Sequence, residues 1–148
     1  MMSGARKVVL AISLLMIASC GFSGGTPYEW KLPPGFPQPQ VPSDNALTQE
    51  KIELGRHLFY DKRLSANATQ SCASCHRQAA AFSEAELTAT GSTGQKHPRN
   101  SMALVNVAYS TTLTWAHPGI TTLEQHLLLP LFGDAPIEMG AAGHEEEI

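Results

Sequence analysis

Hydrophobic residues recur at helical spacing in the segment that follows Thr48. Thr48 is a suitable N-cap, and Glu50 lies in the first turn, where an acidic side chain interacts favourably with the helix dipole. From there to Tyr60, apolar side chains recur at positions compatible with one face of a helix, at Ile52, Leu54, Leu58 and Phe59. The pattern predicts a helix that ends at Tyr60.

Two further helices are expected later in the chain. One covers residues 102–109. The other begins at Thr121-Thr122-Leu123-Glu124, which fits a capping box, and runs to about Leu129, with Pro130 near its end and Gly133 beyond it. The alternation of Val, Ile and Tyr that is typical of strands is absent. The fold is therefore expected to be mostly α with long loops.

The first twenty residues resemble an export signal. Arg6 and Lys7 precede an apolar run of eleven residues, 8–18, which is too short to span a bilayer. Ile17-Ala18-Ser19-Cys20 resembles the lipobox of bacterial lipoproteins, in which the cysteine is lipidated after cleavage. Residues 1–19 are therefore predicted to be a signal peptide and Cys20 the lipidated residue, with an ordinary cleaved signal or a retained anchor as alternatives. Each places the mature chain outside the cytoplasm; the first gives a periplasmic protein held at a membrane by its lipid alone.

Residues 20–46 form a proline-rich segment. Six prolines occur within residues 27–42, and proline favours extended structure over helix or a central strand. The segment is expected to be a tether, although its apolar side chains would also allow it to wrap around the domain; they are Tyr28, Trp30, Leu32 and Phe36. The globular part is expected to cover residues 47–148.

Composition excludes several classes of protein. Among 148 residues, 10 Lys and Arg stand against 13 Asp and Glu, which gives a net charge of −3 and no basic cluster for binding nucleic acid. A single long apolar run excludes a membrane protein with several spans. Three cysteines are too few for a disulfide framework.

The strongest chemical signal is Cys72-Ala73-Ser74-Cys75-His76, the attachment motif of c-type haem. Two thiols one helical turn apart can add to the two vinyl groups on one edge of a porphyrin, and the adjacent imidazole becomes the proximal iron ligand. Zinc would need two more soft ligands, and a thioredoxin-like redox motif would need a βαβ setting. Neither is found in the sequence, so covalent haem c is the predicted cofactor.

The surrounding blocks resemble the di-haem cytochrome c peroxidases and the related MauG-like enzymes, from about Leu47 to the last residue. Residues 54–65 are similar to the entry helix and loop of that family, and residues 71–76 to its first haem site. Arg99-Asn100-Ser101 with Leu104-Val105-Asn106 is similar to its next block. Residues 130–138 are most similar to the MauG-like branch. The resemblance implies a cytochrome c-like helical haem domain.

The resemblance also implies roles for single residues. Glu138 would be the distal acid–base group, because splitting peroxide requires a group that takes a proton from one oxygen and returns it to the other. Trp115 would lie between two haems and assist electron transfer. Asn100 would help to bind an inter-haem calcium through its side-chain oxygen.

The position of a second distal residue is ambiguous. Counting from Trp115 selects Gln125, whereas counting from Leu123-Glu124 selects His126, and a helix directs only one of two successive residues toward the iron. His126 is preferred, because the local frame has no gap there. His97, before Pro98, would be either a sixth ligand in a resting state or a loop residue.

The resemblance implies a second haem, which needs another Cys-x-x-Cys-His motif. Cys20, Cys72 and Cys75 are the only cysteines, and the pattern of residues 143–147 suggests a helix start just before Ile148. The sequence is therefore expected to be the peroxide-handling part of a longer enzyme, with the second haem in the full-length form. Its partners would be hydrogen peroxide and an electron donor, either a small cytochrome or cupredoxin or, in the MauG-like case, a tryptophan of a secreted protein.

Two alternatives belong to other classes. Met139 follows His76 by 63 residues, a spacing similar to that in small cytochromes c, so His76 and Met139 could ligate the haem of a mono-haem electron carrier. The other alternative is a haem-binding lipoprotein without catalysis.

Overall fold

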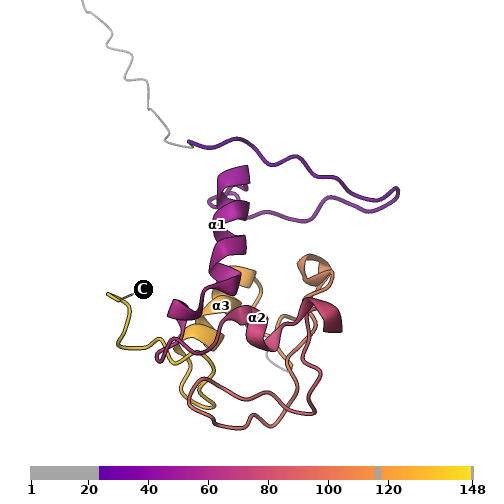
Figure 1. Cartoon of the computed structure of the whole chain (residues 1–148). Helices are drawn as coiled ribbons and strands as arrows, with labels where there is room; N and C mark the ends of the chain where they lie inside the picture. The colour runs from indigo at the N-terminus through magenta and orange to yellow at the C-terminus, as the bar shows by residue number, and fades with distance from the viewer. Residues whose placement is uncertain (1–23, 116–117, 148) are drawn as a thin grey trace, which may run out of the picture.

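The computed structural model describes residues 24–115 and 118–147 (Figure 1). Within these residues the regular structure is helical, and the only β structure consists of isolated bridges, such as that between Arg77 and Ser83. The expectation of a mostly helical chain with long loops is confirmed for this part. The α-helices are α1 (Gln49–Tyr60), α2 (Cys72–Cys75) and α3 (Leu123–Phe132), and the 3-10 turns are η1 (Lys62–Leu64), η2 (Gln78–Ala80) and η3 (Val107–Tyr109).

The first predicted helix is confirmed as α1. The Thr48 hydroxyl accepts a hydrogen bond from the backbone N–H of Lys51 at 3.2 Å, which satisfies a donor of the first turn. The helix ends at Tyr60, and the carboxylate of the next residue, Asp61, accepts the backbone N–H of Arg63 at 2.9 Å and so starts η1. The short helix α2 packs against α1, and the rings of Phe59 and Phe82 lie 6.1 Å apart beside it.

The last predicted helix is confirmed as α3, with two corrections. The N-cap is Thr122, whose hydroxyl accepts the backbone N–H of Gln125 at 3.2 Å, so the cap is displaced by one residue from the expected box. The helix also continues past Leu129 to Phe132. It can do so because its last carbonyls find partners outside the helix, as those of Pro130 and Leu131 do.

The helix expected over residues 102–109 is wrong except for its last turn, η3. Asn106 adopts a left-handed conformation with φ of 58°, which interrupts a helix before Val107. Upstream, the backbone N–H of Leu104 donates to the carbonyl of Phe82 at 3.2 Å instead of to its own segment. Tertiary hydrogen bonds therefore replace the helix that the local pattern predicted.

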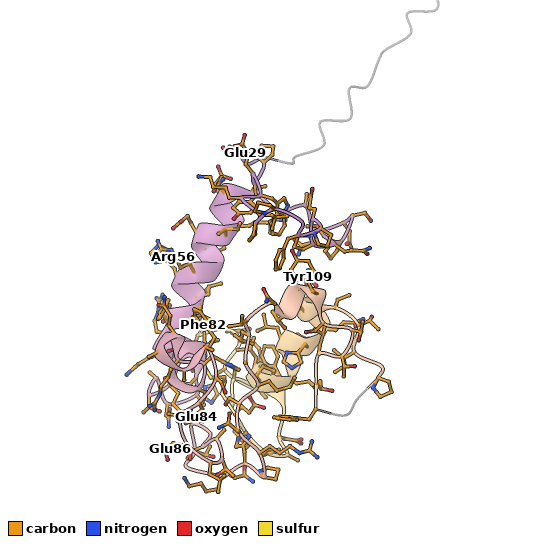
Figure 2. The ribbon with its side chains drawn as sticks, turned by 90° about the vertical axis from the view of Figure 1, so that its right-hand side faces the viewer. Glu29, Arg56, Phe82, Glu84, Glu86 and Tyr109 are labelled. Carbon is orange, nitrogen blue, oxygen red and sulfur yellow. The ribbon has the colours of Figure 1, made fainter. Side chains whose placement is uncertain are left out.

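The described part of the proline-rich segment, residues 24–46, folds back onto the domain. Its start pairs with the N-terminus of α1, since the N–H of Gln49 donates to the carbonyl of Thr26 at 2.9 Å. Farther along, the Tyr109 hydroxyl donates to the carbonyl of Pro37 at 2.8 Å, and the rings of Phe36 and Tyr109 meet edge to face. Figure 2 shows this segment, here named the arm, passing from Glu29 across to Tyr109.

The buried apolar core is small, and large apolar side chains lie on the surface. Among the described residues the buried apolar side chains are Ala89, Leu113, Met139 and Ala141. By contrast α3 exposes a series of leucines, of which Leu128 is 57% exposed, and α1 exposes Leu54 at 58%. Apolar surface of this extent is typical of a face that another group or domain covers. None of the described helices is long and apolar enough to cross a membrane.

Candidate haem-attachment site

The helix α2 places the two thiols of the motif one turn apart. The backbone N–H of Ser71 donates to the Ser74 hydroxyl at 3.0 Å, which fixes the entry to the helix. At the other end the N–H of His76 donates to the carbonyl of Cys72 at 2.9 Å, so the histidine directly follows the helical turn. Cys72 and Cys75 are both free thiols and partly exposed. This is the arrangement that attachment to two vinyl groups requires.

The ring of His76 is held by the loop that follows it. Its Nδ1 lies 3.0 Å from the carbonyl oxygen of Phe82, and because a carbonyl only accepts, Nδ1 carries the proton. Nε2 is therefore the nitrogen with a lone pair for a metal, the usual arrangement of a ligating histidine. The carbonyl of Phe82 is placed by a tight turn. The backbone N–H of Phe82 closes this turn by donating to the carbonyl of Arg77 at 2.8 Å.

The charge of the Glu138 carboxylate affects the pKa of both attachment thiols. Burial raises the pKa of the Cys72 thiol, and the charge of Glu138 raises it further. Burial also raises the pKa of Cys75, with additional contributions from the carboxylates of Glu84 and Glu138. Glu138 lies 62 residues after His76 in the sequence, yet its charge reaches both attachment thiols. Its own side chain is exposed, so it is accessible to a small substrate.

Of the two candidates for the second distal position, His126 lies in the field of this group. Burial lowers the pKa of His126, the charge of Glu138 opposes that effect, and the nearby His76 adds to it. The adjacent Gln125 has its amide oxygen bonded to the backbone N–H of Thr121 at 3.2 Å, at the start of α3. The charges of Glu138 and His76 thus both affect His126, whereas the side chain of Gln125 is directed back along its own helix.

Trp115 and Asn100 have partners of their own. Trp115 is 56% exposed, and the guanidinium of Arg99 lies 5.6 Å from the centre of its ring, a cation–π distance. The side-chain oxygen of Asn100 accepts from the Ser83 hydroxyl at 2.9 Å, and its nitrogen donates to the carbonyls of Glu84 and Glu86. Calcium binding at Asn100 stays a prediction; the described residues contain no cluster of three acidic, histidine or cysteine side chains arranged for a metal.

His97 and Met139 both make hydrogen bonds that involve the chain segment around Glu138. The Nε2 of His97 lies 3.2 Å from the carbonyl oxygen of Ile137, the residue before Glu138. Met139, the residue after it, is buried, and its backbone N–H donates to the carbonyl of Pro130 at 2.9 Å. His97 therefore has a partner in the loop that carries Glu138.

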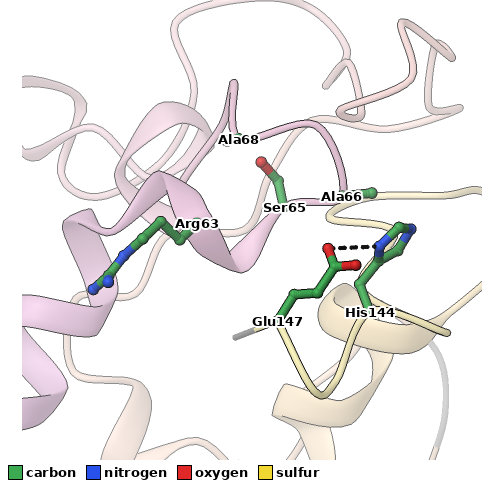
Figure 3. A pocket seen from close by; sticks show the side chains of 6 residues that line it. All are labelled: Arg63, Ser65, Ala66, Ala68, His144 and Glu147. Carbon is green, nitrogen blue, oxygen red and sulfur yellow. Dashed lines mark hydrogen bonds and ion pairs between the residues drawn. The ribbon is translucent and has the colours of Figure 1, made fainter.

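Two hollows lie outside the motif. One, of about 180 Å³, lies between the loop at Ser65 and the C-terminal turn, where the ring of His144 faces the carboxylate of Glu147 at 3.3 Å (Figure 3). That turn stands where the sequence suggested a helix start. The other, of about 660 Å³ and open to solvent, is lined by Arg56, Phe59, Tyr60, Gln78, Phe82 and Leu104.

Sequence reasoning missed two contributors to the site. The role of the Phe82 carbonyl could not be predicted from the sequence, because every residue has a carbonyl. The turn alone directs this one toward the ring of His76. Glu84 follows the motif by eight residues and acts on Cys75, and its Oε2 is buried without a hydrogen-bond partner in the described structure. An acidic residue close behind the motif was the signal that could have been noticed.

A helical, loop-rich domain that carries a Cys-x-x-Cys-His turn has the features of a c-type haem protein. The model of the di-haem cytochrome c peroxidase family matches residues 49–148, and the chain belongs to that family. This confirms the resemblance found in the sequence.

Curated relatives and a solved structure agree with this assignment. The chain is 38% identical over 117 residues to the cytochrome-c peroxidase IdrP1 of Denitromonas iodatirespirans, covering 78% of this chain and 31% of the relative. It is 34% identical over 128 residues to the methylamine utilization protein MauG of Methylophilus methylotrophus, covering 85% and 37%. A crystal structure of a MauG-like protein associated with microbial copper homeostasis is 50% identical, with a TM-score of 0.77, over 81% of this chain and 34% of that one. The chain spans about a third of the length of these proteins.

The family implies haem c, and the residues present fit that cofactor. Both thiols are free and stand on one helical turn, and Nε2 of His76 is available because Nδ1 is occupied by Phe82. The exposed apolar side chains of α3 are suited to contact with a porphyrin or a second domain. Cys72, Cys75 and His76 are thus the residues that would hold the haem.

Proposed function

We propose that this chain forms the peroxide-handling haem domain of a di-haem peroxidase, with haem c joined to Cys72 and Cys75 and ligated by His76. The observation that carries the proposal is the attachment turn, with two free thiols on α2 and Nε2 of His76 left free for iron. The charge of Glu138, which affects the pKa of both thiols and of His126, supports it. A carboxylate near the haem-attachment residues is what a peroxidase needs, and an electron carrier does not require one. Membership of the peroxidase family supports the same conclusion.

The proposed chemistry is the reduction of hydrogen peroxide by two electrons and two protons to two molecules of water. When bound, the haem supplies the iron that takes up peroxide and the path for the electrons. The Glu138 carboxylate accepts the proton of the oxygen nearer the iron and returns it to the farther oxygen, which leaves as water. His126 donates a hydrogen bond to the bound substrate and orients it. The charges of Glu138 and His76 both affect the pKa of His126, whereas the side chain of Gln125 is bonded to the backbone of Thr121. This supports His126 over Gln125 for the role.

The test uses the full chain made in a host that attaches haem c. The wild-type protein is expected to show a pyridine haemochrome band and a covalent mass increase, both lost on Cys72→Ala together with Cys75→Ala. Glu138→Gln should retain the haem and slow the reaction with peroxide by about a hundredfold or more, because one acid–base group is removed. Glu146→Gln, an exposed acid near the C-terminus, is the matched control. Covalent haem combined with an unchanged rate in Glu138→Gln would contradict the proposal.

The same samples test the electron-carrier alternative. A carrier ligated by His76 and Met139 would give a six-coordinate low-spin spectrum that is lost on Met139→Ala. The proposed enzyme domain instead gives a high-spin ferric haem that reacts with peroxide. The spectrum of the wild-type protein is the primary test of Met139 ligation. Met139 is buried, so its replacement by alanine would also disturb the packing.

The electron source and the second haem extend the proposal to the longer protein. The 50% identity to a MauG-like structure supports the MauG-like branch, in which a tryptophan of a secreted partner is the expected donor. A small cytochrome or cupredoxin is the donor expected for a peroxidase. Peroxide-dependent oxidation of a reduced small cytochrome, against peroxide-dependent modification of a partner tryptophan, distinguishes the two. A calcium bound near Asn100 would be removed by a chelator, with loss of activity in the longer protein.

For location, we propose export to the periplasm with lipidation at Cys20, which lies outside the described residues. The prolines of residues 20–46 and the contact of the arm with Tyr109 are both compatible with a tether that also wraps around the domain. Cys20→Ser is expected to release the haem protein from the membrane fraction into the soluble periplasmic fraction. Unchanged fractionation, or a mature mass without lipid, would contradict lipidation.

A further inference from the structure

The backbone on both sides of Glu138 is gripped by one loop, residues 89–97. The N–H of Ser92 donates to the carbonyl of Glu138 itself at 2.7 Å, and the Ser92 hydroxyl donates to the carbonyl of Met139 at 2.9 Å. A Cβ added to Gly91 would overlap the carbonyl oxygen of Ile137, so the two chain segments touch at a residue without a side chain. Three successive residues, 137–139, are therefore fixed from the same side.

Two side chains of this loop complete the grip on Ile137. The amide oxygen of Gln95 accepts the backbone N–H of Ile137 at 3.1 Å, and Nε2 of His97 lies 3.2 Å from its carbonyl oxygen. Because that carbonyl can only accept, Nε2 of His97 is the donor. His97 is itself anchored, since its backbone N–H donates to the carbonyl of Ala89 at 2.9 Å. The loop thus bonds both polar groups of the peptide unit next to Glu138.

We propose that His97 is a positioning residue for Glu138: through its hydrogen bond to the Ile137 carbonyl it fixes the carboxylate where proton transfer to and from peroxide takes place. This inference rests on the proposed function of Glu138. It gives His97 a role other than iron ligation or a passive place in the loop. Displacing an acid–base group by about 1 Å can cost a hundredfold in rate, so a single bond at this point has a measurable effect.

The experiment measures the peroxide reaction of the haem-loaded full chain in three variants. His97→Leu removes the donor and is expected to slow the reaction about ten- to a hundredfold. His97→Gln, whose amide nitrogen can replace Nε2, should restore most of the rate. His144→Leu removes another half-buried imidazole that does not contact residues 137–139, and should leave the rate unchanged. Carbon monoxide binding to the reduced haem, which needs no proton transfer, should be the same in all of them.

A double-mutant cycle separates positioning from general structural damage. If His97 acts through Glu138, then His97→Leu has little further effect once Glu138→Gln is present. An equal loss of rate in both backgrounds, altered carbon monoxide binding in His97→Leu, or no rescue by His97→Gln would overturn the inference. If Glu138→Gln alone leaves the rate unchanged, the proposed function fails. If Glu138→Gln slows the reaction but His97→Leu does not, only the role of His97 fails.

Discussion

Backbone carbonyls orient several side chains of this site. Phe82 fixes the ring of His76, Ile137 receives His97, and the carbonyls of Glu84 and Glu86 hold the amide of Asn100. A carbonyl points where the chain path directs it, so residues with unusual backbone angles determine the geometry. Ala81, the residue before Phe82, has a positive φ of 55°.

Replacing Ala81 by glycine is expected to stabilise the protein by about 0.5–1 kcal/mol. The left-handed conformation costs an alanine about 1 kcal/mol or more, and glycine adopts it freely at a smaller cost in chain entropy. The matched control is Ala79→Gly, exposed in η2 without a positive φ, which should lose about 0.5–1 kcal/mol. The measurement is the free energy of unfolding of the haem-loaded protein in denaturant. Destabilisation by both substitutions to the same extent would refute the argument.

At the scale of elements, the end of α3 and the Glu138 segment form one unit. The last carbonyls of a helix lack partners within it. Here the N–H of Met139 donates to Pro130 at 2.9 Å and that of Ala141 to Leu131 at 2.8 Å. The chain that carries Glu138 therefore caps the helix that carries His126, and the two candidate distal groups are coupled through backbone bonds.

The N-cap of the same helix gives a prediction at this scale. Thr122→Ala should lower the free energy of unfolding by about 1 kcal/mol, because the N–H of Gln125 loses its acceptor. Thermal unfolding should then occur a few degrees lower. Thr121→Ala is the control, since the bond of Thr121 to Gln125 uses its backbone N–H, which the substitution retains. A larger loss at Thr121 than at Thr122 would place the cap where the sequence pattern first suggested it.

Helices with local signals could be predicted from the sequence, and those overruled by distant contacts could not. The hydroxyl of Thr48 and the apolar spacing after it define α1 within a residue. A helix is also expected over residues 102–109, but the left-handed Asn106 and the bond from Leu104 to Phe82 interrupt it. The extension of α3 beyond Leu129 depends on Met139 and Ala141, which no local pattern includes.

The site could be predicted as far as the residue types impose the chemistry. The motif at residues 72–76 has one dominant interpretation, and the family match supports it. The sequence left Gln125 and His126 as alternatives, because one residue of slippage turns the helix by about 100°. The bond from His97 to Ile137 joins positions 40 residues apart, so the sequence offered no sign of it.

At the scale of the whole molecule, the arm closes over a domain with little core of its own. Tyr109 holds the arm at Pro37, while the other end is fixed to α1 by Thr26 and Glu50. Gly25 allows this close approach, because a Cβ there would lie 2.8 Å from Oε2 of Glu50. The start of the arm is thus bonded to an ionisable side chain as well as to the backbone of α1.

The bond to Glu50 predicts an acid-sensitive arm. The N–H of Thr26 donates to Oε2 of Glu50 at 2.9 Å, and the backbone N–H groups of Glu50 and Thr26 hold the pKa of Glu50 below its usual value of 4.5. A carboxylate with a lowered pKa contributes stability that is complete above 4.5 and is lost as the pH falls through the lower folded value. The protection of the Thr26 amide against hydrogen exchange, corrected for the intrinsic rate, should therefore be constant above about pH 5 and fall below about pH 4. In Glu50→Gln the same amide should be less protected and insensitive to pH across this range, since the remaining acceptor does not titrate. Unchanged protection of Thr26 down to pH 3 in the wild-type protein would show that the arm is held without the charge of Glu50, by its backbone pairing to Leu47 and Gln49 and its contacts with Tyr109.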